Sequence, residues 1–146
     1  MYSDFEYTGY IFACSPEPQS GKSRLLEVLE LLVANPSGVL ISPSEAILFR
    51  TAEGHTQLLD EVDGWTNKDE LRNVLNAEFH RGATVQRMAD SDTGYEVRSF
   101  PVYAPRSLAG IGHTVLHGTT WDRTFVLDMV RQTKPELFVF SACESE

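Results

Sequence analysis

Long apolar runs are missing from this sequence. No stretch approaches the roughly 20 consecutive apolar residues that a membrane-spanning helix requires. Residues 1–6 are acidic, whereas a secretory signal would be basic and then apolar. These absences predict a soluble, cytoplasmic protein without a membrane partner.

Cysteine is scarce as well. Cys14 and Cys143 are the only cysteines among the 146 residues, too few for a disulfide framework. Neither has a metal-ligand spacing to any of the four histidines. His113 and His117 are four residues apart and could share one helix face, but the sequence places no acidic or cysteine partner beside them. The pattern therefore disfavours a zinc site.

Positive charge is in short supply. Lysine and arginine number 12 against 21 acidic residues, which gives a formal net charge of −9. Nucleic-acid phosphates are bound by clustered lysine and arginine, so the net charge does not support DNA as a partner. A local basic patch stays open, because six arginines fall between Arg81 and Arg131. Scattered surface arginines are the preferred interpretation.

The most informative motif that is present is Gly21-Lys22-Ser23. It stands between an apolar run at 10–14 and an amphipathic helical pattern at about 22–34. A strand that turns into a helix directs backbone N–H groups and the positive helix dipole at one point, where a triphosphate would bind. Gly21 allows close approach, Lys22 reaches the β and γ oxygens, and the Ser23 hydroxyl is a ligand for Mg²⁺. The same loop and first turn supply the other expected nucleotide-binding residues: Pro18, Gln19, Ser20 and Arg24.

This motif is incomplete by itself. The full phosphate-loop pattern has glycine five positions before Gly21, and this sequence has Pro16 there. A solvated helix N-terminus with glycine at the turn is the alternative interpretation.

A second signal follows at 58–61, where an apolar strand pattern ends in Asp60 and Glu61. Mg²⁺ keeps most of its waters and takes few protein ligands, so Asp60 is expected to hold the metal with Ser23. Glu61 is expected to act as the base that positions the attacking water. An acidic strand end at the surface is the alternative.

Strand and helix patterns alternate along the chain. Strands are expected at 10–14, 39–41, 56–61, 101–104 and 124–130. Three helices are expected: one at 22–34, a second that follows the strand at 39–41 and ends at about 53, and a third at 67–80. A β-hairpin is inserted at about 84–100, and a last apolar segment at 137–140 is expected on the sheet edge. This alternation predicts an α/β domain over residues 1–146 with a parallel sheet covered on both faces.

The sequence also resembles a known family. The motifs at 15–29 and 58–63, together with those at 71–77, 81–83, 108–112 and 122–123, are similar to an uncharacterised helicase-like ATPase domain. That family occurs in bacterial, plasmid and phage proteins, often beside primase modules. The resemblance covers nearly the whole chain and implies an AAA-like P-loop NTPase: a three-layer sandwich with an additional strand in a mostly parallel five-stranded sheet.

The resemblance implies roles for individual residues. Lys22 and Glu61 would act in catalysis, and Arg123 would reach the γ-phosphate of a neighbouring subunit; the alternative for Arg123 is a salt bridge to Asp122 or Asp128. A γ-phosphate sensor is expected just after the fourth strand, at Ser107 or Arg106.

Two functions follow as hypotheses. The first is Mg²⁺-dependent binding and hydrolysis of a nucleotide, with ATP as substrate, coupled to DNA replication or remodelling in a homo-oligomer or with a larger helicase or primase relative. The second is a module that regulates such a relative without hydrolysis. The second is favoured by the absence of the base-contacting segment and helical lid that the family usually has. A small-molecule kinase is disfavoured, because no arginine-rich lid follows the third strand.

Overall fold

The computed structural model describes residues 4–65, 68–77, 79–91, 94–116 and 118–131. Five strands form one parallel sheet in the order β2-β3-β6-β1-β7. Their bounds are β1 (Tyr10–Ser15), β2 (Pro36–Ile41), β3 (Thr56–Asp60), β6 (Arg106–Ile111) and β7 (Thr124–Asp128). The predicted α/β class and mostly parallel five-stranded sheet are thereby confirmed.

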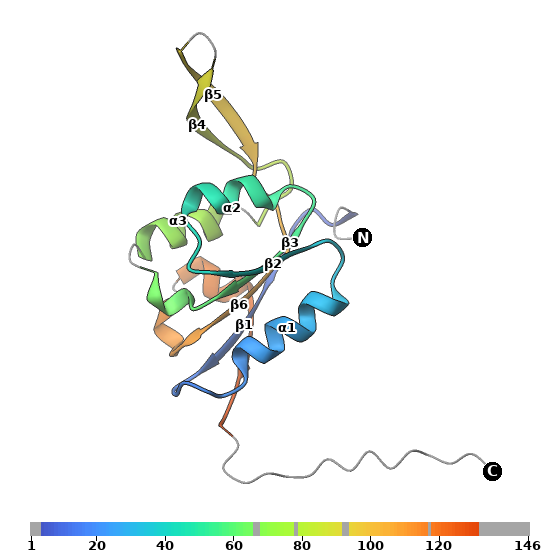
Figure 1. The fold of residues 1–146 in the computed structure, drawn as a ribbon, viewed down its shortest axis with the longest axis vertical. Helices are drawn as coiled ribbons and strands as arrows, with labels where there is room; N and C mark the ends of the chain where they lie inside the picture. The colour runs from blue at the N-terminus through green and yellow to red at the C-terminus, as the bar shows by residue number, and fades with distance from the viewer. Residues whose placement is uncertain (1–3, 66–67, 78, 92–93, 117, 132–146) are drawn as a thin grey trace, which may run out of the picture.

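Helices lie on both faces of this sheet (Figure 1). The helix α1 (Lys22–Leu32) covers one face, and α2 (Glu45–Ala52) and α3 (Lys68–Ala77) cover the other. Short 3-10 turns follow β3 and β6: η2 (Val62–Gly64), η3 (His113–Val115) and η4 (Gly118–Arg123). No helix in the described part of the chain is long and apolar enough to cross a membrane.

The strand β1, which lies between β6 and β7, divides the core into two clusters. Successive side chains of a strand point to opposite faces, so Tyr10, Phe12 and Cys14 pack with α2 and α3, whereas Ala13 packs under Leu26 of α1. All five side chains are at most 1% exposed. Because β1 is buried on both faces of the sheet, its carboxyl end is held in a fixed position between the layers.

Counted along the chain, the fourth strand of the main sheet lies at a different position from the one predicted. It is β6, at Arg106–Ile111, and not the apolar segment 101–104. The strand begins with a buried arginine, which a hydrophobicity pattern does not indicate. The Arg106 guanidinium is satisfied internally, by Gln57 Oε1 at 2.6 Å and by the carbonyl oxygens of Val102 and Ala104, each at 3.3 Å.

The predicted hairpin is present and somewhat longer than expected. It consists of β4 (Thr84–Ser91) and β5 (Gly94–Pro101), which pair only with each other and project away from the main sheet (Figure 1). The other elements end within a few residues of their predicted bounds. The apolar segment at 137–140 lies outside the described residues.

Candidate functional site

A cleft of about 410 Å³ opens at the carboxyl edge of the sheet, where β1, β3 and β6 end. The strands are parallel and in register, with Ser15 opposite Ile111, so the segments that follow them converge at this edge. The lining residues come from the β1–α1 loop (residues 16–21), the first turn of α1 and the ends of β3 and β6: Pro18, Gln19, Ser20, Gly21, Lys22, Ser23, Arg24, Asp60, Glu61, Asp63, Gly64, Gly110 and Ile111. The structure thus brings all seven predicted nucleotide-binding residues together with Asp60 and Glu61.

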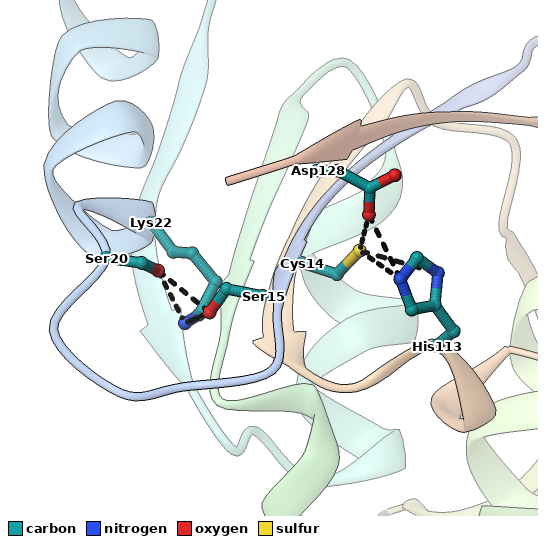
Figure 2. A network of polar contacts seen from close by, with 6 residues as sticks. All are labelled: Cys14, Ser15, Ser20, Lys22, His113 and Asp128. Atoms are coloured by element: carbon teal, nitrogen blue, oxygen red, sulfur yellow. Dashed lines mark hydrogen bonds and ion pairs between the residues drawn. The ribbon is translucent and has the colours of Figure 1, made fainter. Parts of the chain in front are cut away.

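Lys22 is buried within the β1–α1 loop and is 8% exposed. Its ammonium donates to Ser15 Oγ at 2.6 Å and to Ser20 Oγ at 3.0 Å (Figure 2). It also donates to the Glu17 carbonyl oxygen at 3.1 Å. Among the described residues, no carboxylate forms an ion pair with Lys22. A buried positive charge surrounded by neutral oxygens is costly, and a bound anion would offset that cost.

The β1–α1 loop also presents backbone donors to the cleft. Gly21 is the N-cap residue of α1 and has φ 87°, a left-handed conformation that favours glycine. No side chain caps this helix, and the first N–H groups of a helix have no partner within the helix. Lys22, Ser23 and Arg24 therefore offer N–H groups at the positive end of the α1 dipole.

The departure from the phosphate-loop pattern at Pro16 lies away from the cleft. Pro16 is exposed and is not among the lining residues. Gln19, in contrast, lines the cleft in a left-handed conformation, with φ 58°. This conformation costs about 1 kcal/mol for a residue other than glycine, so the contacts around Lys22 hold the loop in a shape that Gln19 does not prefer.

Asp60 and Glu61 occupy different environments at the end of β3. Asp60 is 8% exposed, and its carboxylate accepts a hydrogen bond from the Glu61 backbone N–H at 2.8 Å. Glu61 turns the chain with φ 55° and leaves its own side chain exposed. The buried carboxylate of Asp60 is suited to hold a cation, and the solvated carboxylate of Glu61 can accept a proton from water.

Four lining residues were not predicted from the sequence, Asp63, Gly64, Gly110 and Ile111, and contacts among them join the η2 turn after β3 to β6. The Asp63 carboxylate accepts the Ile111 backbone N–H at 2.8 Å. At Gly110 a Cβ atom would lie 2.9 Å from Val62 Cγ2 and 3.0 Å from Asp63 Oδ1, so only glycine allows this approach. Gly110, a glycine inside an apolar strand pattern, was the available signal for such packing.

The predicted sensor residues lie at the edge of the sheet opposite the cleft and are not among the residues that line it. Arg106 and Ser107 begin β6, where Arg106 is in register with Tyr10, the first residue of β1. Five residues of strand, about 16 Å, separate Arg106 from the carboxyl edge. They lie there because the strand spans Arg106–Ile111, whereas the sequence predicted it at 101–104.

Arg123 also lies at the amino edge of the sheet, because it precedes Thr124, which is in register with Tyr10. Its guanidinium packs over the Phe79 ring, 3.5 Å from the centroid. None of the ion pairs among the described residues joins Arg123 to an aspartate. Its action on a neighbouring subunit stays a prediction.

A second polar cluster, which was not predicted from the sequence, lies on the side of β1 opposite Lys22. Cys14 Sγ is 3.2 Å from Asp128 Oδ1, and His113 Nε2 is 3.0 Å from the same oxygen (Figure 2). Cys14 Sγ also lies 3.8 Å from His113 Nδ1 and 3.9 Å from Nε2. Burial and, secondarily, the hydrogen bond and charge of Asp128 raise the pKa of Cys14 to about 11. The signal available in the sequence was that each of the three residues stands within two positions of the carboxyl end of a strand.

No family model matches the sequence, and no curated protein matches it. The two groups of side chains at the carboxyl edge of the sheet are therefore the structural indications of function.

Proposed function

We propose that this chain binds a nucleoside triphosphate, with ATP as the expected substrate, together with Mg²⁺ and hydrolyses it. The observation that carries the proposal is the buried ammonium of Lys22, which has three neutral acceptors and no carboxylate partner among the described residues. The same cleft contains the open first turn of α1. Both features favour an anion, and triphosphates are bound in this way at helix N-termini.

The acidic side of the cleft fits a hard divalent cation. Mg²⁺ prefers oxygen ligands and retains several waters, and the cleft offers the Ser23 hydroxyl and the buried Asp60 carboxylate. One Asp60 oxygen is oriented by the Glu61 N–H. Ser23 and Asp60 are therefore the residues that would hold Mg²⁺, and the ion would neutralise charge on the phosphates.

Phosphoryl transfer depends mainly on positioning and on stabilisation of charge. Lys22 and the backbone N–H groups of α1 would hold the phosphate oxygens. Glu61, exposed at the cleft, would orient a water molecule and accept its proton. The position of β6 between β1 and β3 is the additional-strand order that the family resemblance implies, and it supports an AAA-like P-loop assignment.

The coupling of hydrolysis to DNA replication or remodelling, in a homo-oligomer or with a helicase or primase relative, is proposed on the family resemblance alone. The formal net charge of −9 does not favour direct binding of DNA. We therefore place a protein partner ahead of DNA.

The test is saturable nucleotide binding by the purified chain, measured by calorimetry for ATP and GTP, with Mg²⁺ and with EDTA. We expect Mg²⁺-dependent binding that weakens when Asp60 is changed to Asn. Glu53→Asn is a matched control, because Glu53 is an exposed carboxylate at the end of α2, outside the cleft.

Three outcomes separate the hypotheses. Binding followed by release of phosphate supports the full proposal. Binding without any release leaves the regulatory module as the better function. An absence of saturable binding by either nucleotide refutes the proposed nucleotide-hydrolysing function.

A further inference from the structure

We infer that Cys14, His113 and Asp128 form a binding site for a divalent transition metal, with Zn²⁺ the best fit, separate from the nucleotide cleft. The three side chains offer one sulfur, one nitrogen and one oxygen ligand, all within 4.8 Å of one another. The site uses none of the residues assigned above to nucleotide or Mg²⁺.

The spacing of the three ligand atoms suits tetrahedral coordination. Zinc bonds of about 2.3 Å to sulfur and about 2.0–2.2 Å to nitrogen or oxygen place tetrahedral ligands about 3.4–3.6 Å apart. The observed separations are 3.2 Å from sulfur to oxygen, 3.9 Å from sulfur to Nε2 and 3.0 Å from Nε2 to oxygen. Each differs from the tetrahedral value by about 0.4 Å or less, so small side-chain rotations would complete the site.

The fold places these ligands in advance. Cys14 on β1 and Asp128 on β7 are direct register partners, so their side chains leave the sheet on the same face. His113 begins η3, just after β6 on the other side of β1. The Cys14 and Ser15 carbonyls accept backbone N–H groups from Met129 at 2.8 Å and Gly112 at 2.9 Å. These bonds fix the three chain segments before any ion binds.

The donor set selects the class of metal. Thiolate and imidazole ligands favour zinc and other transition metals over Mg²⁺ and Ca²⁺, which prefer oxygen. Cys14 is buried, whereas the side chains of His113 and Asp128 are 53% and 68% exposed. The site therefore opens to solvent on one side, where water would complete the coordination of an ion held by three protein ligands.

A cysteine–histidine–aspartate catalytic triad is a poorer interpretation of the same residues. In a triad the histidine lies between the nucleophile and the carboxylate. Here Asp128 Oδ1 contacts both the thiol and the imidazole. Three ligands that contact one another around a common centre are the arrangement of a metal site.

The experiment uses the full chain without nucleotide and titrates it with Zn²⁺, and separately with Co²⁺, whose thiolate charge-transfer absorption reports a sulfur ligand. We expect one equivalent to bind, with affinity lowered by about tenfold or more in His113→Ala and in Asp128→Asn. Cys14→Ser should remove the charge-transfer absorption. Excess Mg²⁺ should not displace the ion.

Matched controls locate the binding. Cys143→Ser removes the other cysteine, and His55→Ala removes an exposed histidine outside the cluster; both should bind like the parent. Because His113 and Asp128 are exposed, their variants are expected to keep the parent's circular dichroism. Absence of saturable uptake overturns the proposal, as does uptake that survives in the cluster variants or is lost in the controls. Lys22→Met should bind Zn²⁺ like the parent. The zinc titration therefore tests the metal site whether or not the chain binds nucleotide.

Discussion

Replacement of Lys22 by methionine separates its role toward an anion from its role in folding. Methionine retains a long unbranched side chain but removes the ammonium. In the parent this ammonium donates to three neutral oxygens and has no carboxylate partner among the described residues. Ser20 Oγ also donates to Ser15 Oγ at 2.8 Å, a hydrogen bond in which the ammonium takes no part. Loss of a buried charge that lacks a counter-ion is close to neutral for stability, so we expect the free energy of unfolding to change by less than about 1 kcal/mol.

The effect on nucleotide binding should be much larger. Hydrogen bonds to charged groups contribute about 1.5–3 kcal/mol each. Two such bonds, from Lys22 to the β- and γ-phosphates, amount to about 3–6 kcal/mol, or about 10²- to 10⁴-fold in affinity. Calorimetry with Mg·ATP measures the affinity, and urea unfolding measures the stability.

Arg50→Met is the matched control, because Arg50 is an exposed cation on α2 outside the cleft. It should bind nucleotide like the parent. A folded Lys22→Met protein with the parent's affinity for Mg·ATP would refute the assignment of the β1–α1 loop to phosphate binding.

Four further expectations follow from the other residues. Glu61→Gln should retain nucleotide binding and lower phosphate release by about 10²- to 10⁴-fold, whereas Glu53→Gln should change neither; equal loss of both properties would contradict a role as base. Gly110→Ala should lower the free energy of unfolding in urea by about 1–3 kcal/mol, because the added Cβ would lie 2.9 Å from Val62 Cγ2. Gly64→Ala is the control, since a Cβ there would lie 3.8 Å from its nearest neighbour. An equal loss of stability in the two variants would count against the clash. Arg123→Ala should lower the turnover rate by about 10³-fold while its affinity for nucleotide stays nearly unchanged. A mixture of the Arg123→Ala and Lys22→Met proteins should regain activity. If the mixture stays inactive, the contact of Arg123 with Phe79 is better interpreted as purely structural. The pKa of Cys14 is raised to about 11, so this thiol contributes stability below the ordinary thiol pKa, and the contribution is lost as pH rises through 11. The free energy of unfolding, measured between pH 8 and 11, should therefore decrease more steeply with pH for the parent than for Cys14→Ser. An equal pH dependence of the two proteins would exclude the effect.

The sequence predicted which residues meet at the cleft because the motifs that supply them are short and local. Gly21-Lys22-Ser23 and Asp60-Glu61 each follow an apolar strand pattern, and alternation with helices makes those strands parallel. Parallel strands bring their carboxyl ends to one edge, so two distant motifs had to meet. The structure then added Asp63 and Gly110, whose contact depends on how closely η2 approaches β6.

What the sequence did not predict depends on long-range packing. The polar start of β6 is stable because Gln57, from a neighbouring strand, accepts from the Arg106 guanidinium. The Cys14, His113 and Asp128 cluster joins residues far apart in the chain, and spacing rules search only nearby positions. His117, the histidine first considered beside His113, lies outside the described residues.

The alternation of side chains along β1 constrains how this protein can change during evolution. Cys14 faces His113 and Asp128, and the next residue, Ser15, faces Lys22 across the strand (Figure 2). Insertion or deletion of one residue upstream within this six-residue strand would exchange the two faces and disrupt both groups at once. Length variation among relatives should therefore avoid β1 and collect in the hairpin of β4 and β5, which pair only with each other.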